Sequence, residues 1–119
     1  MKPIDIKSAE HYHWGNGCDG WHLVKNESLS VIEENVPAGE EEVRHYHVTA
    51  QQFFYVLSGS VVIELDGDRH VLEKGMGLHV PKGLPHLLKN VDTEDVRFLV
   101  VSQPMSHGDR VEVSPQSND

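Results

Sequence analysis

Residues 51–73 read QQFFYVLSGSVVIELDGDRHVLE, and this stretch decides the fold class. From residue 60 to residue 65 apolar positions alternate with others, which is the period-two pattern of a β-strand. Asp66-Gly67 follows, and this dipeptide is typical of tight turns between antiparallel strands because it tolerates positive φ angles. We therefore predict a β-hairpin over residues 60–73, preceded by a strand over residues 51–58.

Short segments of the same kind extend outward in both directions. Further strands are predicted over residues 21–25, 28–36, 77–80, 85–90 and 96–102. Apolar residues occur on both sides of the strand 51–58, so we expect both of its faces to be buried or half-buried. At least eight short strands, with no helical pattern longer than a turn, predict an all-β sandwich or a small closed barrel that can hold one ligand. The polar tail from residue 104 onward is expected to fray.

Length, charge and cysteine content narrow the class of protein further. A chain of 119 residues has room for one domain, given roughly 150 residues per domain. The single cysteine, Cys18, excludes a disulfide framework and indicates a reducing, cytoplasmic location. Ten Lys and Arg against nineteen Asp and Glu give a net charge of −9, which disfavours nucleic acid as a partner. The N-terminal residues contain no apolar leader segment, and no window approaches the roughly 20 apolar residues that span a bilayer, so we expect no membrane partner.

Nine histidines are many for this length, and three of them have positions that are compatible with a shared metal ion. His45 and His47 are two residues apart on an extended segment, so both imidazoles point to one face and can share a metal ion. His86 supplies a third nitrogen if the strands around residues 43–47 and 85–90 are neighbours. The alternative is that all three imidazoles are hydrogen-bonded or merely exposed. Four of the histidines outside the motifs described next are predicted to lie on the surface: His11, His13, His70 and His107.

Two segments resemble the two motifs of the cupin superfamily. Residues 39–59, GEEEVRHYHVTAQQFFYVLSG, resemble the first motif, in which a glycine precedes His-x-His, a glutamate and a second glycine. Residues 75–90, GMGLHVPKGLPHLLKN, match every fixed position of the second motif. The resemblance covers residues 28–102 of a single domain over residues 1–119, leaving an N-terminal arm over residues 1–27 and a polar tail over residues 104–119.

The resemblance implies a double-stranded β-helix, or jelly-roll barrel, of about six to eight strands. It also implies one divalent transition metal ion inside the barrel, bound by His45, His47, Gln52 and His86. Iron, nickel, zinc, manganese and copper all suit such ligands. Gln52 departs from the family pattern, which has glutamate there, and four neutral ligands would leave the metal more electrophilic. The alternative is that Gln52 does not reach the metal or that the site is empty.

The side-chain alternation also predicts a pocket around the metal. Phe54 and Val56 share the side of Gln52, and Leu88 shares that of His86, which predicts an apolar lining. Trp21 is expected either over the barrel mouth or in the core, and His79 is a further pocket candidate within the second motif. No catalytic proton carrier is assigned, although four residues are candidates: His79, Tyr46, Tyr55 and Glu64.

These observations lead to three functional hypotheses. We expect a metal-dependent enzyme that acts on a small oxygenated molecule such as a sugar acid, a keto acid or an enol. The glutamine ligand resembles that of small bacterial cupins of unsaturated uronate metabolism, which favours isomerisation or tautomerisation. The alternatives are an iron-dependent dioxygenase and a non-enzymatic module that binds a small molecule unchanged. The resemblance also implies a homodimer, and residues 1–10 are long enough to cross to a partner.

Overall fold

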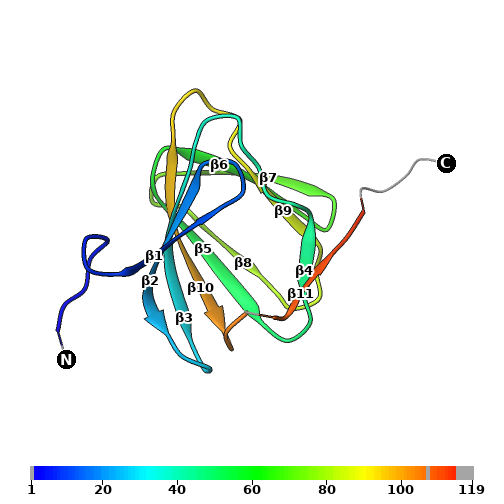
Figure 1. Ribbon diagram of the computed structural model, residues 1–119. Coiled ribbons are helices and arrows are strands. Elements are labelled where there is room, and N and C mark those ends of the chain that lie inside the picture. The colour runs from blue at the N-terminus through cyan, green and yellow to red at the C-terminus, as the bar shows by residue number, and fades with distance from the viewer. Residues whose placement is uncertain (1, 107, 115–119) are drawn as a thin grey trace.

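The computed structural model describes residues 2–106 and 108–114. These residues form eleven β-strands, shown in Figure 1: β1 (Glu10–Trp14), β2 (Cys18–Lys25), β3 (Ser30–Val36), β4 (His45–His47), β5 (Gln51–Ser58), β6 (Ser60–Leu65), β7 (Asp68–Glu73), β8 (Gly77–Val80), β9 (His86–Lys89), β10 (Val96–Gln103) and β11 (Arg110–Glu112). No helix within the described part of the chain has the length and apolarity needed to cross a bilayer.

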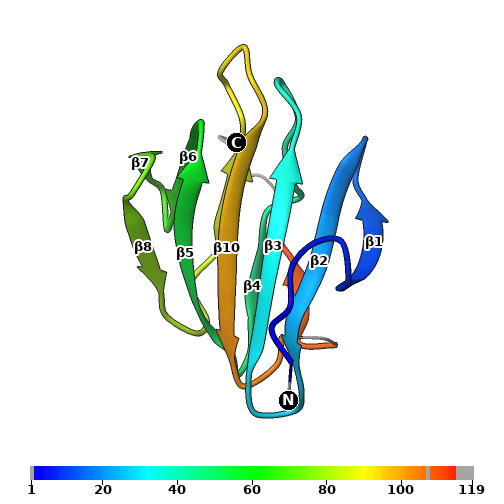
Figure 2. The same ribbon diagram turned by 90° about the vertical axis from the view of Figure 1, so that its left-hand side faces the viewer.

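The strands form two antiparallel sheets that face each other. One sheet has the order β1-β2-β3-β10-β5-β8, and Figure 2 views it face-on. The other has the order β11-β4-β9-β6-β7 and lies behind it in that view. Most neighbours within a sheet are distant in sequence, which is the arrangement of a jelly roll. The all-β jelly-roll fold expected from the sequence is confirmed, with more strands than the resemblance implied.

The predicted strands around residues 51–73 form as expected. β5 spans residues 51–58, and β6 and β7 pair through a turn in which Asp66 has φ 49° and Gly67 has φ 89°. One expectation for β5 was wrong. Phe53 and Tyr55 are 41% and 38% exposed, because they point out of the six-stranded sheet and only the alternate residues face the barrel interior.

Two strands lie where none was predicted. β1 pairs with β2 and extends the six-stranded sheet, while β11 pairs with β4 in the other sheet. The tail was therefore wrongly expected to fray throughout. Asp109 anchors it, because its carboxylate accepts hydrogen bonds from the backbone amides of Val48, Thr49 and Ala50 at 2.8–3.0 Å. Residues 115–119 and the predicted surface residue His107 lie outside the described residues.

The inward-facing side chains of both sheets form one hydrophobic core. Its buried members come from eight strands and include Cys18, Val36, Phe54, Val56, Val61, Ile63, Leu72, Val80, Leu88, Val96, Phe98 and Val100. A cavity lies beside this core, and polar side chains from both sheets reach its wall.

Candidate metal centre

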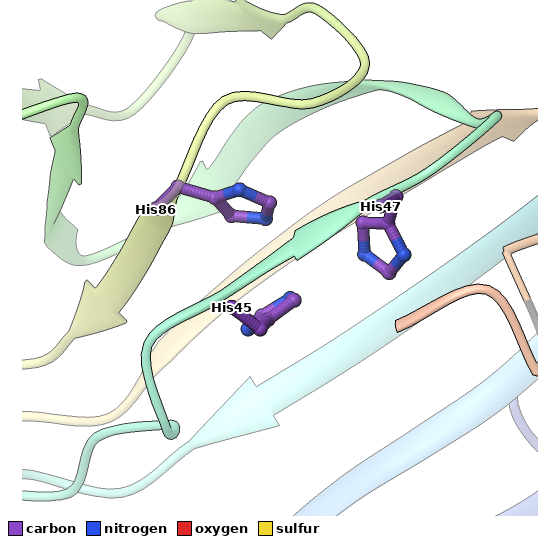
Figure 3. A group of neighbouring side chains, drawn as sticks. All are labelled: His45, His47 and His86. Atoms are coloured by element: carbon purple, nitrogen blue, oxygen red, sulfur yellow. The ribbon is translucent and has the colours of Figure 1, made fainter. Parts of the chain in front are cut away.

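Three histidines converge inside the barrel from two neighbouring strands. His45 and His47 come from β4, and His86 comes from β9, where it is paired directly opposite His45. The ring centroid of His45 lies 4.4 Å from that of His86 and 5.0 Å from that of His47. One ring nitrogen of each residue lies within 4.8 Å of the other two, and Figure 3 shows the rings facing a common space. The strand adjacency on which the sequence argument depended is thus confirmed.

Backbone carbonyl groups set the tautomers of two of these imidazoles. Nδ1 of His45 donates to the Val43 carbonyl at 2.7 Å, and Nδ1 of His86 donates to the Leu84 carbonyl at 3.0 Å. Because a carbonyl only accepts, Nδ1 carries the proton in each ring and Nε2 keeps a free lone pair. Nε2 of His86 and Nδ1 of His47 are buried and have no hydrogen-bond partner within the described chain.

Burial keeps all three imidazoles neutral. Loss of hydration lowers the pKa of His45 to about 3 and that of His47 to about 4, and it also lowers the pKa of His86. Neutral imidazoles at pH 7 present lone pairs rather than charged N–H groups. The cluster is therefore ready to act as a set of metal ligands.

Gln52 brings an amide group to the wall of the same cavity as His45 and His47. It lies on the inner face of β5, whereas Gln51 is exposed on the outer face. Nε2 of Gln52 donates to Oγ of Ser102 at 3.1 Å, while its Oε1 is buried with no partner among the residues that the structure describes. Buried polar atoms without partners cost free energy, and a bound cation would satisfy them. Three imidazoles and one amide oxygen therefore fit a divalent transition metal ion.

A cavity of about 600 Å³ opens beside these residues. Its wall contains His45, His47 and Gln52, whereas His86 is 1% exposed and is not one of the described residues that line it. The predicted apolar residues Phe54 and Leu88 both line it, together with side chains that the sequence did not single out: Ile32 and Val100.

Three predicted pocket residues lie elsewhere. Val56 is packed in the hydrophobic core, because it is one repeat farther along β5 than Phe54. His79 faces outward from β8 and bonds to Oε1 of Gln51 at 2.9 Å. Trp21 faces outward from β2, where the Arg97 guanidinium lies 5.0 Å from its ring centroid. The alternation of strand residues did not reveal which face of β2 and β8 is the inner one.

The cavity wall also carries three carboxyl groups that sequence reasoning missed: Glu10, Glu34 and Glu42. Glu42 accepts a hydrogen bond from the Leu88 amide at 3.1 Å, and burial raises its pKa to about 7. Burial and the nearby Glu42 charge raise the pKa of Glu34 to about 8. Glu34 shares the side of Val36 on β3, so strand alternation held the signal that places it inside. The position of Glu42 before β4 gave no such signal.

The other acid–base candidates from the sequence do not line the cavity. Tyr55 is exposed on the outer face of β5. Glu64 forms an ion pair with Lys89 at 2.9 Å. Tyr46 lies between His45 and His47, so its side chain points to the opposite face of β4. It is not among the described residues that line the cavity.

A second, exposed cluster lies on the β1–β2 hairpin. Oδ1 of Asp19 is 2.7 Å from Nε2 of His11 and 3.0 Å from Nδ1 of His13. The expected surface position of both histidines is confirmed. Because its histidines are exposed, this cluster provides a control for experiments on the buried one.

Comparison with known proteins identifies relatives of this chain. The family model described as "Cupin domain" matches residues 32–102. An uncharacterized protein of Methanocaldococcus jannaschii is 29% identical over 89 residues, covering 74% of this chain and 71% of that protein. "Polyketide synthase CurC" of Streptomyces cyaneus is 32% identical over 68 residues, which cover 57% of this chain and less than half, 44%, of that protein.

Solved structures share the fold at lower sequence identity. KdgF from Halomonas sp. superposes with a TM-score of 0.81 at 17% identity, covering 90% of this chain and 98% of that one. The polyketide cyclase RemF from Streptomyces resistomycificus gives a TM-score of 0.83 at 20% identity, covering 99% of this chain and 89% of that one. At these identities the likeness establishes the fold.

Proposed function

Because this chain belongs to the cupin family, we propose that it is a metal-dependent enzyme that isomerises or tautomerises a small oxygenated substrate. The substrate class is a sugar acid, a keto acid or an enol. The observation that carries the proposal is the set of buried, neutral donors at and beside one cavity: three imidazoles and Oε1 of Gln52, which has no hydrogen-bond partner among the described residues.

His45, His47, His86 and Gln52 would hold one divalent transition metal ion. When bound, the ion supplies Lewis-acid polarisation of a substrate oxygen. Because all four donors are neutral, no ligand charge offsets that of the ion, which favours an anionic or electron-rich oxygen ligand.

The rest of the cavity supports binding of a small anion. Ile32, Phe54 and Val100 provide an apolar part of its wall. Lys25 is paired with Glu10 at 2.9 Å, whereas Arg110 donates to the Val43 carbonyl at 3.3 Å and has further N–H groups for a carboxylate. Similarity to a protein named as a polyketide synthase adds support for enolisable substrates.

Elemental analysis of untagged, natively purified protein tests the metal site. We expect nearly one metal ion per chain in the wild type and its loss in His86→Ala. The matched control is His13→Ala, which also removes one imidazole but from the exposed cluster, and it should keep the ion. Retention by His86→Ala, or absence of metal before and after reconstitution, would contradict the proposed centre and favour a binding module.

Turnover of the metal-loaded protein tests the reaction type. We expect conversion of uronates or keto acids without oxygen consumption. Oxygen uptake that requires both iron(II) and substrate would replace this proposal with a dioxygenase. Gln52→Glu should bind the metal more tightly and turn over more slowly, because a carboxylate both strengthens the ligand set and offsets the metal charge.

A further inference from the structure

Three residues form a row across neighbouring strands at the cavity wall. Tyr12 on β1 is paired with Gly20 on β2, and Gly20 is paired with Glu34 on β3. The Tyr12 hydroxyl donates to Oε1 of Glu34 at 3.4 Å, although β2 lies between the two strands. Tyr12 and Glu34 both line the cavity that contains His45 and His47.

The absence of a side chain at Gly20 makes this contact feasible. A Cβ atom at Gly20 would lie 2.2 Å from Cζ and 2.5 Å from the hydroxyl oxygen of Tyr12. The phenol therefore occupies the space that any other residue would fill. Gly20 has no positive φ that would otherwise require glycine, so close approach of the Tyr12 ring accounts for it.

Glu34 has the surroundings of a proton acceptor and donor rather than of a structural ion pair. Loss of hydration and the neighbouring Glu42 carboxylate raise its pKa to about 8, against the opposing effects of the Tyr12 hydrogen bond and Arg110. A carboxyl group that titrates near the working pH is suited to both roles. Burial raises the pKa of Tyr12 above its ordinary value, so the phenol stays protonated and donates.

We propose that Glu34, positioned by Tyr12 across Gly20, transfers the substrate proton in this cavity, an inference that rests on the proposed function. The Glu34 carboxylate takes a proton from the carbon next to the substrate carbonyl. The C–H bond breaks, its electron pair forms the C=C bond, and the carbonyl π electrons move to oxygen. Glu34 then gives the proton to that oxygen, which completes a keto-to-enol tautomerisation, and the reverse sequence restores the ketone. No oxidant or reductant is consumed.

Deuterium exchange into pyruvate and D-glucuronate by the metal-loaded full chain in D₂O, followed by ¹H NMR, tests the transfer. We expect Glu34→Gln to lower the exchange rate by roughly 100-fold or more while metal content stays unchanged. The matched control is Glu33→Gln, the outer-face neighbour that pairs with Arg97, which should stay within about twofold of wild type.

The positioning role of Tyr12 and Gly20 has its own readout. Tyr12→Phe removes the bond that favours the charged carboxylate, so the rising limb of the exchange–pH profile should move to higher pH. Gly20→Ala should shift it in the same direction, because the added methyl group displaces the phenol. Other charged or titratable groups at this cavity wall also influence the exchange–pH profile through their charges: Glu10, His22, Lys25, Glu42, His45, His47 and Arg110.

A ¹³C NMR titration of the Glu34 carboxyl group in the metal-free protein distinguishes failure of the role of Glu34 from failure of the proposed function. We expect titration well above the ordinary range, with Glu34→Gln identifying the resonance. Titration in the ordinary range, or wild-type exchange rates in Glu34→Gln, would overturn the role of Glu34 and leave the proposed function standing. Absence of exchange in the wild type, with metal bound and Glu34 titrating as expected, would instead overturn the proposed function and this inference with it.

Discussion

Asn90 shows how a single buried amide can hold two segments together. It is 1% exposed, and its Nδ2 donates to the carbonyls of Val36 at 3.0 Å and Glu94 at 2.8 Å. Its Oδ1 accepts from the Asp92 amide at 3.0 Å. This one side chain thus ties the end of β3 to the loop before β10, which accounts for the asparagine at the last fixed position of the second motif.

We predict that Asn90→Ala strongly destabilises the protein. Two carbonyl groups and one amide lose their partner inside the fold, so the free energy of unfolding should fall by about 2–4 kcal/mol. Urea denaturation measures it. Asn35→Ala is the control, because its 3.2 Å bond to Asp95 is at the exposed face, and its cost should be below about 1 kcal/mol. Equal losses in the two variants would contradict this account.

At the scale of elements, the one-residue connection between β5 and β6 depends on Gly59. Its φ is +78°, and a Cβ there would lie 2.6 Å from the Asp95 carbonyl oxygen and 3.1 Å from Cα of Val96. Val96 is the first residue of β10 and Asp95 directly precedes it, so the backbone that would have to move is at the edge of, and within, the six-stranded sheet. Gly39 has a similar φ of +81° with nothing within 4 Å of such a Cβ.

We therefore predict that Gly59→Ala costs more stability than Gly39→Ala. Both variants carry the strain of a left-handed residue, roughly 1–2 kcal/mol, but only Gly59→Ala also meets the backbone. Its unfolding free energy should fall by at least about 2 kcal/mol more than that of Gly39→Ala. Thermal and urea unfolding of both variants measure the difference, and similar values would mean that the sheet yields without cost.

At the scale of the whole molecule, two sets of titratable groups at the cavity act on stability in opposite directions. The pKa values of His45 and His47 are lowered to about 3 and about 4. Below about pH 6.5 the unfolded chain therefore binds protons at these imidazoles that the folded chain does not bind. The pKa values of Glu34 and Glu42 are raised to about 8 and about 7, so the folded chain keeps protons that the unfolded chain releases above about pH 4.5.

The metal-free protein should consequently lose stability toward both acid and alkaline pH. Each imidazole lowers the unfolding free energy as the pH falls from about 6.5, and each carboxyl group lowers it as the pH rises from about 4.5, by up to about 1.4 kcal/mol per pH unit. Glu34→Gln removes one alkaline contribution. Its stability relative to wild type should increase by at least about 1 kcal/mol between pH 5 and pH 8, measured by urea denaturation, whereas a constant difference would refute the raised pKa.

We also predict that two chains associate through the outer face of the six-stranded sheet. Phe53 and Tyr55 are exposed on the outer face of the six-stranded sheet, beside Leu99 and Val101 on β10. Such an apolar sheet face favours packing against a second copy. Light scattering should give twice the 13.4 kDa chain mass. Tyr55→Lys should shift the mass toward the monomer, while Val71→Lys, at an exposed position on the other sheet, should not.

Local pattern alone determined much of this molecule. The alternation over residues 51–73 and the Asp66-Gly67 turn predict the β5–β7 strands, because side-chain period and turn chemistry act over a few residues. The motif spacing placed His45, His47 and His86 on candidate strands, and alternation placed Gln52 on the face opposite Gln51. These are properties that neighbouring residues impose on one another.

Only the tertiary structure decided which strands are neighbours and which face is inside. The pairing of β4 with β9 sets His86 opposite His45, and the β1-β2-β3 order brings Tyr12 over Gly20 to Glu34. In the tertiary structure Trp21 and His79 also face outward, and part of the polar tail forms β11, which pairs with β4. Alternation predicts which residues of a strand share a face. What that face packs against depends on contacts between segments far apart in the chain, and a local pattern does not include the energies of those contacts.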